Sequence, residues 1–369
     1  MDKEQATTPM MTWPGCLHAP PRIALVSGFW GQNIGNAFFN VGGKWILQQI
    51  FGDHAVDFIQ DQPGYRTFHN QTKGNPKQDF VFLKELDIEY IVLQGPCLTS
   101  TFPALWEETF ARLTARGTRI ILLGCALFKY TDEEVATARA FLKKYPPAVM
   151  STRDSKTYEK FKDLDFPCHD GLDSAFFAPK AYTPFRVQEH DYITFNFDRF
   201  PEPTIKITED SSAGVSFQHF SKSWTLKTPR VQQWWSRRGK AQAYFGHLLD
   251  FRRLPDKICG YRIVRPEHRF NPHMTYKIYQ HPNAVASDEP FTYFTVYANT
   301  ALTLADRVHA CVATLAYGNP AMLFTPSPRS ALFERIGLDD IRNRPCSLDM
   351  DWLEEQRQQQ LSFLADVLE

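Results

Sequence analysis

The stretch YIVLQGPCLTSTFPALWEETFARLTARGTRIILLGCALFKYTDEEVATARAFLKK, residues 90–144, decides the fold class. Two short runs in it, at 90–93 and 119–123, are apolar apart from Arg119. Each run is followed by a longer segment with apolar residues at helical spacing, at 104–116 and 131–144. Short strands without polar alternation are typical of a parallel sheet that helices cover on both faces. The stretch therefore predicts an α/β fold.

The same alternation extends in both directions along the chain. Residues 22–27 predict a strand, and 35–51 have the apolar spacing of a helix. Residues 180–230 are rich in Pro, Ser, Thr and aromatic side chains, so we expect a domain boundary and irregular structure there. Beyond them the alternation resumes, which predicts two Rossmann-like α/β domains with a cleft between them. The expected parts are a flexible leader (1–20), an N-terminal domain (21–180), a C-terminal domain (181–345) and a final helical segment (346–369) that packs back on the first domain.

Composition excludes several classes of protein. Lysine plus arginine and aspartate plus glutamate both number 41, so a basic protein that coats nucleic acid is not expected. The longest apolar run, Ile120–Phe128, is too short to span a bilayer. Seven cysteines lie far apart without a CxxC pair, which argues against a disulfide scaffold or a zinc ribbon. We therefore expect a cytoplasmic location, either free or at the inner face of the membrane.

The segment Asp306-Arg307-Val308-His309 carries the clearest chemical signal. It lies where a short strand passes into a helix, which is the end of a parallel sheet where ligands bind. The guanidinium of Arg307 suits a phosphate or carboxylate, and His309 can exchange a proton near neutral pH. A structural alternative stays open here: an aspartate that caps the helix, a surface arginine and a packed histidine.

Two further segments place polar residues after predicted strands. Asn33-Ile34-Gly35-Asn36 follows the first strand and suits a loop that approaches a ligand closely. Arg153 and Asp173 also follow strands, where the arginine can bind an anion and the aspartate can orient it. An ordinary turn and simple helix capping are the alternatives for these segments.

Residues 220–265 form a basic stretch, which contains eleven Lys or Arg residues against Asp250 and Asp256. Trp224 and two further tryptophans are interleaved with them. This composition suits an acidic glycan, another anionic ligand or a membrane surface, although a solvated helix face with buried tryptophans fits it equally well. Three histidines between 268 and 281 lack carboxylates at metal-ligand spacing, so no metal site is predicted.

Taken in order, four of these motifs resemble the polysaccharide pyruvyl transferase family. The family has an Asn-x-Gly-Asp loop, an Arg-Asp pair, an Asp-x-Ala-Phe-like turn and a Ser-Asp-Arg-Leu-His segment before a helix that ends in Gly-x-Pro. The matching residues are Asn33–Asn36, Arg153-Asp154, Asp173–Phe176, Ala305–His309 and Gly318–Pro320.

The likeness covers residues 22–340, with two departures. Asn36 replaces the family aspartate, and Gln94-Gly95-Pro96 stands where the family often has a glycine-rich turn. Both departures lie in the half that we expect to face the acceptor, so they bear on the acceptor more than on the donor.

The resemblance implies a fold like the GT-B glycosyltransferases, with phosphoenolpyruvate as co-substrate and no other cofactor. It implies a sugar or a lipid-linked oligosaccharide as acceptor, with peripheral membrane contact through 220–265 and no nucleic acid. His309 is the expected catalytic acid, because the enol carbon of the donor must take up a proton. The expected donor contacts are Arg307, Arg153 and Asp306, and the expected acceptor contacts are Asn33, Gly35, Asn36 and Asp173.

Two other functions stay open. A nucleotide-sugar-dependent GT-B glycosyltransferase would use the same Arg307 and His309 corner to hold a diphosphate. A non-catalytic glycan-binding or membrane-binding protein on the same fold would explain the basic stretch. The presence of both Arg307 and His309 argues against this second alternative.

Overall fold

The computed structural model describes most of the chain. The described residues are 22–28, 30–31, 33–60, 83–188, 192–197, 200–207, 214–227, 252–268, 281–324 and 327–368. The predicted leader and residues 228–251 of the basic stretch lie outside them. Within the described ranges, no helix has the length and apolar character needed to cross a membrane.

A six-stranded parallel sheet forms the first domain, with the order β2-β1-β3-β4-β5-β6. Its strands are β1 (Ile23–Ser27), β2 (Val56–Gln60), β3 (Tyr90–Leu98), β4 (Arg119–Leu127), β5 (Val149–Thr152) and β6 (Cys168–Asp170). Its helices are α1 (Gly35–Phe51), α2 (Phe102–Thr114), α3 (Asp132–Lys144), α4 (Ser155–Phe161), η5 (Ser174–Phe177) and α5 (Ala178–Ala181).

Both faces of this sheet are covered, as the apolar strands predict. Alternate residues of β4 enter two different cores: Ile121 packs with α1 on one face, and Ile120 packs with α2 and α3 on the other. Thr131 caps α3 by accepting a hydrogen bond from the Glu134 backbone N–H at 3.3 Å. The α/β class predicted from residues 90–144 is confirmed.

A second sheet has the order β11-β12-β7-β14-β15, with β13 beside β12. Its strands are β7 (Tyr192–Asn196), β11 (Lys257–Ile258), β12 (Tyr261–Pro266), β13 (Ala284–Val285), β14 (Thr303–Ala305) and β15 (Ala321–Leu323). All its pairs are parallel except β11 with β12. The helices that follow are α9 (Phe291–Ala298), α10 (Val308–Ala316), α11 (Ala331–Arg335) and α12 (Met350–Leu368). Two Rossmann-like sheets are therefore present, as expected.

The prediction of irregular structure at 180–230 is wrong. Strand β7 lies at the centre of the second sheet and is buried along its whole length. A separate antiparallel sheet follows, made of β8 (Thr204–Ile207), β9 (Val215–His219) and β10 (Lys222–Lys227). Trp224 of the basic stretch is fully buried in it and stacks on Phe217. These strands are short and lie among turn-forming residues, which hid them in the sequence.

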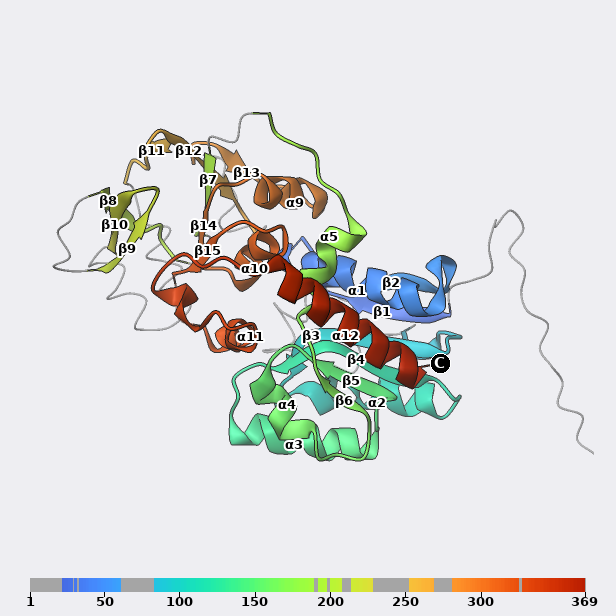
Figure 1. The fold of residues 1–369 in the computed structure, drawn as a ribbon. Helices are drawn as coiled ribbons and strands as arrows, with labels where there is room; N and C mark the ends of the chain where they lie inside the picture. The colour runs from blue at the N-terminus through green and yellow to red at the C-terminus, as the bar shows by residue number, and fades with distance from the viewer. Residues whose placement is uncertain are drawn as a thin grey trace, which may run out of the picture.

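The two domains join where α1, η5 and α10 pack on one another. Figure 1 shows α12 leaving the second domain and crossing back over the first, where it packs against α1 and β5. The Gln360 side chain on α12 accepts a hydrogen bond from the Leu172 backbone N–H at 2.7 Å, and Arg357 donates to the Phe176 carbonyl. This helix therefore holds the segment that leads into η5, where Asp173 lies.

Candidate functional site

Segments from both domains meet at the carboxyl ends of parallel strands, the edge where open α/β sheets bind ligands. Arg153 follows β5, Asp173 follows β6, and His309 lies in the first turn of α10, after β14. These three residues belonged to different expected roles: donor contact, acceptor contact and acid. The structure brings them into one cluster, which we call the Arg153–Asp173–His309 cluster.

The carboxylate of Asp173 is the centre of this cluster. Its Oδ2 accepts a hydrogen bond from Arg153 Nη1 at 2.8 Å and lies 3.3 Å from His309 Nε2. Its Oδ1 accepts from the Ala175 backbone N–H at 2.9 Å. Burial alone would raise the pKa of Asp173, but His309 and Arg153 outweigh it and hold the pKa well below its ordinary value. Asp173 is therefore an ionised carboxylate that pairs with the Arg153 guanidinium and contacts the His309 ring.

Burial of His309 favours the neutral form of its side chain. Burial lowers the pKa of its imidazole, and this effect outweighs the charge of Asp173. The positive charges of Arg153 and Arg329 lower the pKa of His309 further. The ring is accordingly neutral at neutral pH until another negative charge arrives.

Arg153 keeps hydrogen-bonding capacity beyond its ion pair. The side chain is 1% exposed, and Nη1 bonds to Asp173. Within the part of the chain that the structure describes, Nε and Nη2 have no hydrogen-bond partner. A buried unpaired donor is costly, and the Nε–Nη2 edge of a guanidinium is shaped for two oxygens of one carboxylate or phosphate. The arrangement therefore suits an oxyanion that is bound in two places.

The loop before α1 reaches the second domain. The Ile34 backbone N–H donates to the His268 carbonyl at 2.8 Å. A Cβ on Gly35 would lie 3.3 Å from both His268 Nδ1 and His309 Cβ, so a glycine here permits the close approach. Asn33 Nδ2 donates to Asn36 Oδ1 at 3.0 Å, which ties the two ends of the loop together. This loop thus contacts the acid candidate directly, through Gly35.

Arg307 and Asp306 precede α10 without capping it by a side-chain bond. Arg307 is 5% exposed, and its Nε lies 3.8 Å from Asp306 Oδ1. Asp306 Oδ2 accepts from the Phe200 backbone N–H at 2.7 Å. Asp306 therefore anchors the segment after β7 and faces Arg307 at the same time. The alternative of a helix cap at Asp306 is wrong, because Arg307 occupies the cap position.

Arg329 was not among the site residues expected from the sequence. Its guanidinium lies 5.6 Å from the centre of the Phe128 ring, so an arginine after β15 stacks on the aromatic residue after β4 of the other domain. Its charge also acts on His309. The available signal was its position after β15. This strand pairs in parallel with β14, so Arg329 follows a strand at the same sheet edge as Arg307.

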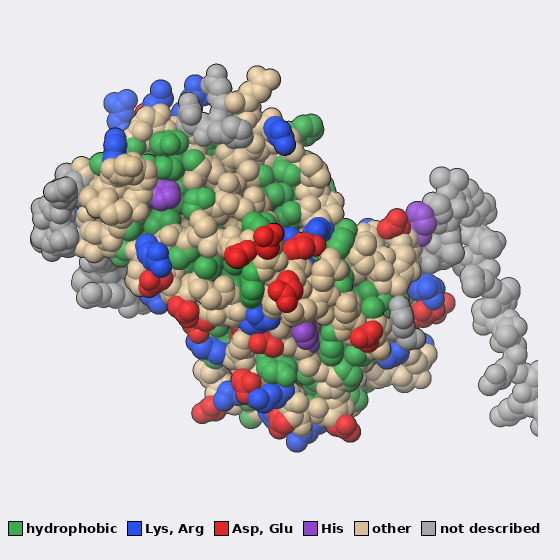
Figure 2. Space-filling view, viewed as in Figure 1, with side chains coloured by type: hydrophobic (Ala, Val, Ile, Leu, Met, Phe, Trp, Pro, Cys, Tyr) green, Lys and Arg blue, Asp and Glu red, His purple; other side chains and the backbone are tan. Residues whose placement is uncertain are grey.

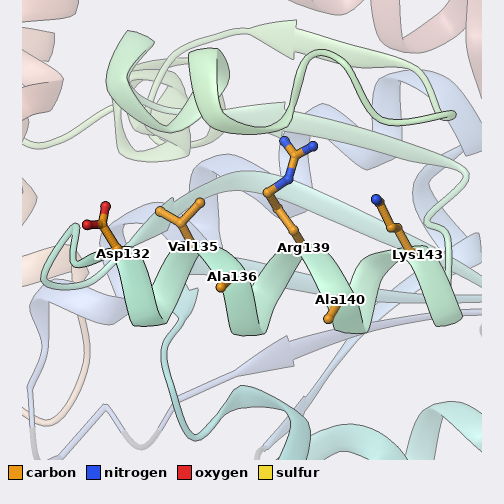
Figure 3. A pocket seen from close by; sticks show the side chains of 6 residues that line it. All are labelled: Asp132, Val135, Ala136, Arg139, Ala140 and Lys143. Carbon is orange, nitrogen blue, oxygen red and sulfur yellow. The ribbon is translucent and has the colours of Figure 1, made fainter.

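Other features of the described surface do not point to a site. A shallow hollow along α3 is lined by Asp132, Val135, Ala136, Arg139, Ala140 and Lys143 (Figure 3). Arg139 in this hollow is paired with Asp163, and the helix lies on the outer side of the first sheet, away from the cluster. Figure 2 shows basic and acidic side chains mixed over the α3 and α4 side of the molecule. Among the described residues, no group of three His, Cys, Asp or Glu side chains could hold a metal ion.

Solved structures with a similar fold share little sequence identity with this chain. MnaA of S. aureus with UDP is 11% identical with a TM-score of 0.49, over 94% of this chain and 90% of that one. UDP-GlcNAc 2-epimerase of Neisseria meningitidis with UDP-GlcNAc is 9% identical with a TM-score of 0.48, over 93% and 99%. Similarity at this level carries no inference about activity. No curated protein matches the chain.

The family comparison is more specific. The model of the family described as polysaccharide pyruvyl transferase matches residues 33–328, which is most of the chain. The match begins at the Asn33 loop and includes the Arg153–Asp173–His309 cluster. The chain therefore belongs to the polysaccharide pyruvyl transferase family.

Proposed function

We propose that this protein transfers a pyruvyl group from phosphoenolpyruvate to two hydroxyls of a sugar and forms a cyclic ketal. The observation that carries the proposal is the buried Nε–Nη2 edge of Arg153, which is unpaired among the described residues and adjoins the Asp173–His309 pair. Family membership supports the same reaction class. The proposal assigns no cofactor beyond phosphoenolpyruvate as co-substrate.

The donor carries a phosphate and a carboxylate, which both need cationic partners. Arg153 would bind one of these groups in two places through its Nε–Nη2 edge. Arg307 would bind the other from the second domain, held in place by Asp306. Guanidinium groups fixed in a buried site stabilise developing negative charge without having to reorganise during the reaction.

His309 would supply the proton. The two anionic groups of the donor raise the pKa of the imidazole that burial has lowered, so the ring becomes protonated when the donor binds. Asp173 holds Nε2, which leaves Nδ1 to protonate the methylene carbon. We therefore propose that Asp173 orients the His309 ring. This role replaces the acceptor contact that was expected from the sequence.

The remaining steps follow from this protonation. The C=C bond becomes a methyl group beside an oxocarbenium-like carbon, and one sugar hydroxyl adds to that carbon with loss of its proton. Phosphate leaves with its bonding electron pair, and a second hydroxyl closes the ketal and releases its proton. Asn33, Gly35 and Asn36, in the loop beside His309, are the proposed acceptor contacts. A free or lipid-linked sugar as acceptor and membrane contact through 220–265 stay predictions.

The direct test incubates the protein with phosphoenolpyruvate and a panel of sugars. Release of phosphate together with the mass increase of a pyruvyl ketal on one sugar is the expected result. His309→Gln should bind phosphoenolpyruvate within a few fold of the parent and lose about 10²-fold or more in turnover. Normal turnover in His309→Gln would place the acid elsewhere.

Thermal stability separates this proposal from a nucleotide-sugar enzyme. Phosphoenolpyruvate should raise the Tm of the parent, because a ligand that binds only the folded state stabilises it. UDP-sugars should leave the Tm unchanged. Stabilisation by UDP-sugars alone would contradict the proposal and favour the glycosyltransferase alternative.

A further inference from the structure

Gln94, in the middle of β3, makes three hydrogen bonds with its side-chain amide. Its Oε1 accepts from Asn40 Nδ2 at 2.9 Å, and its Nε2 donates to the Phe39 carbonyl at 3.2 Å and to Ser174 Oγ at 3.1 Å. The residue is 9% exposed. One amide therefore joins the central strand β3 to helix α1 and to the first residue of η5.

Gln94 Nε2 donates to Phe39, which contacts His309, and to Ser174, which adjoins a residue that contacts His309. The ring of Phe39 packs against the His309 ring, with the two centres 5.2 Å apart. Ser174 follows Asp173, whose Oδ2 lies 3.3 Å from His309 Nε2. A shift of the Gln94 amide would thus displace the aromatic contact on one side of the imidazole and the carboxylate contact on the other.

The surrounding glycines leave room for this arrangement. A Cβ on Gly43 would lie 1.8 Å from Gln94 Nε2, so an alanine there would displace the amide. Gly95 has φ +72°, and a Cβ on it would lie 3.0 Å from the Phe39 ring. Two backbone positions therefore lack side chains at the points where Gln94 and Phe39 need the space.

We propose that Gln94 is a positioning residue that holds the imidazole of His309 for proton transfer, through Phe39 on one side and Ser174 with Asp173 on the other. The role in proton transfer rests on the proposed function. The charged side chains that act on the imidazole are Asp173, Arg153 and Arg329, and Gln94 itself carries no charge. Its effect on His309 is therefore exerted through geometry.

The test compares Gln94→Met with Asn299→Leu. Asn299 is a buried amide that also accepts one hydrogen bond and donates two: its Oδ1 accepts from the Val187 N–H, and its Nδ2 donates to the Phe185 and Thr295 carbonyls. It lies at the end of α9 and the domain connection, so its replacement is a matched loss of three hydrogen bonds elsewhere. Each variant is measured for Tm, for the pH titration of the His309 ring by NMR, and for turnover.

Gln94→Met should shift the His309 titration and lower turnover by about tenfold or more, because small displacements of catalytic groups have large effects on rate. Its Kd for phosphoenolpyruvate should change less than threefold. Asn299→Leu should lower Tm to a similar extent and leave the His309 titration and turnover unchanged. If Gln94→Met does not fold, Gln94→Asn, which stays uncharged but is one methylene shorter, is measured in the same way.

An unchanged His309 titration in a folded Gln94 variant, or an equal shift in Asn299→Leu, would overturn the inference. The NMR titration needs no substrate. Failure of the parent to use phosphoenolpyruvate would therefore refute the proposed reaction. The NMR titration would still show whether Gln94 positions His309.

Discussion

Replacing Asp173 by asparagine removes the negative charge at the centre of the cluster and keeps the shape of the side chain. The side chains of Arg153 and Asp173 are each 1% exposed, and Arg153 Nη1 lies 2.8 Å from Asp173 Oδ2. Removal of one partner of such a buried pair leaves an uncompensated charge, which costs about 3–5 kcal/mol of unfolding free energy. Against a typical total of about 5–15 kcal/mol, this loss is large.

An exposed pair in the same domain is the control. Arg22 and Glu89 are joined at 2.6 Å, a slightly shorter contact, but their side chains are 55% and 52% exposed. Water screens such a pair, so Glu89→Gln should cost about 0.2–1 kcal/mol. Urea unfolding of both variants at pH 7, with equal m-values, gives the two costs directly. A cost for Asp173→Asn no greater than that for Glu89→Gln would refute the assignment of a buried ion-paired cluster.

The acid dependence of this difference provides a second check. The folded-state pKa of Asp173 lies below its ordinary value. Its contribution to stability is therefore fully present above the unfolded pKa, about 4, and is lost as pH falls toward the folded pKa. The difference in stability between parent and Asp173→Asn should shrink over that acid range, as measured by urea unfolding at each pH.

Long uninterrupted patterns made much of the fold predictable. The helix at 35–51 has the predicted bounds, because apolar spacing continues through it and stops at Gly52. Strand β7, Tyr192–Asn196, was missed for the converse reason. It has five residues, is buried on both faces and has no glycine or proline directly before it, so it shows neither alternation nor a clear boundary.

The residues of the site were easier to predict than their grouping. Arg153, Asp173 and His309 were each identified from their positions after strands, but Asp173 and His309 lie 136 positions apart. Which strand ends meet depends on how closely α1 and η5 pack. A Cβ on Gly42 would lie 1.9 Å from the Ser174 carbonyl oxygen, so this contact exists only with glycine there. Such a tertiary requirement leaves no periodic signal in a single sequence.

Three further predictions concern packing, donor binding and protonation. Gly42→Ala should lower Tm, because the alanine Cβ would collide with the Ser174 carbonyl. This loss is expected although alanine is more favourable than glycine in a helix by about 1 kcal/mol. An unchanged Tm would contradict the close packing of α1 on η5. Arg307→Ala should weaken phosphoenolpyruvate binding by about 2–5 kcal/mol in calorimetry, with only partial rescue by lysine, and unchanged affinity would remove Arg307 from the donor site. Donor binding should take up a proton at His309, because burial lowers the pKa of the free imidazole and the donor's negative charges raise it in the complex. Affinity should therefore increase as pH falls between these two pKa values. The donor phosphate itself titrates near pH 6, so the comparison is made with His309→Gln in buffers of different ionisation enthalpy. Equal proton uptake by parent and His309→Gln would show that His309 is not the group that is charged by the donor, and so would remove the reason for assigning it as the acid.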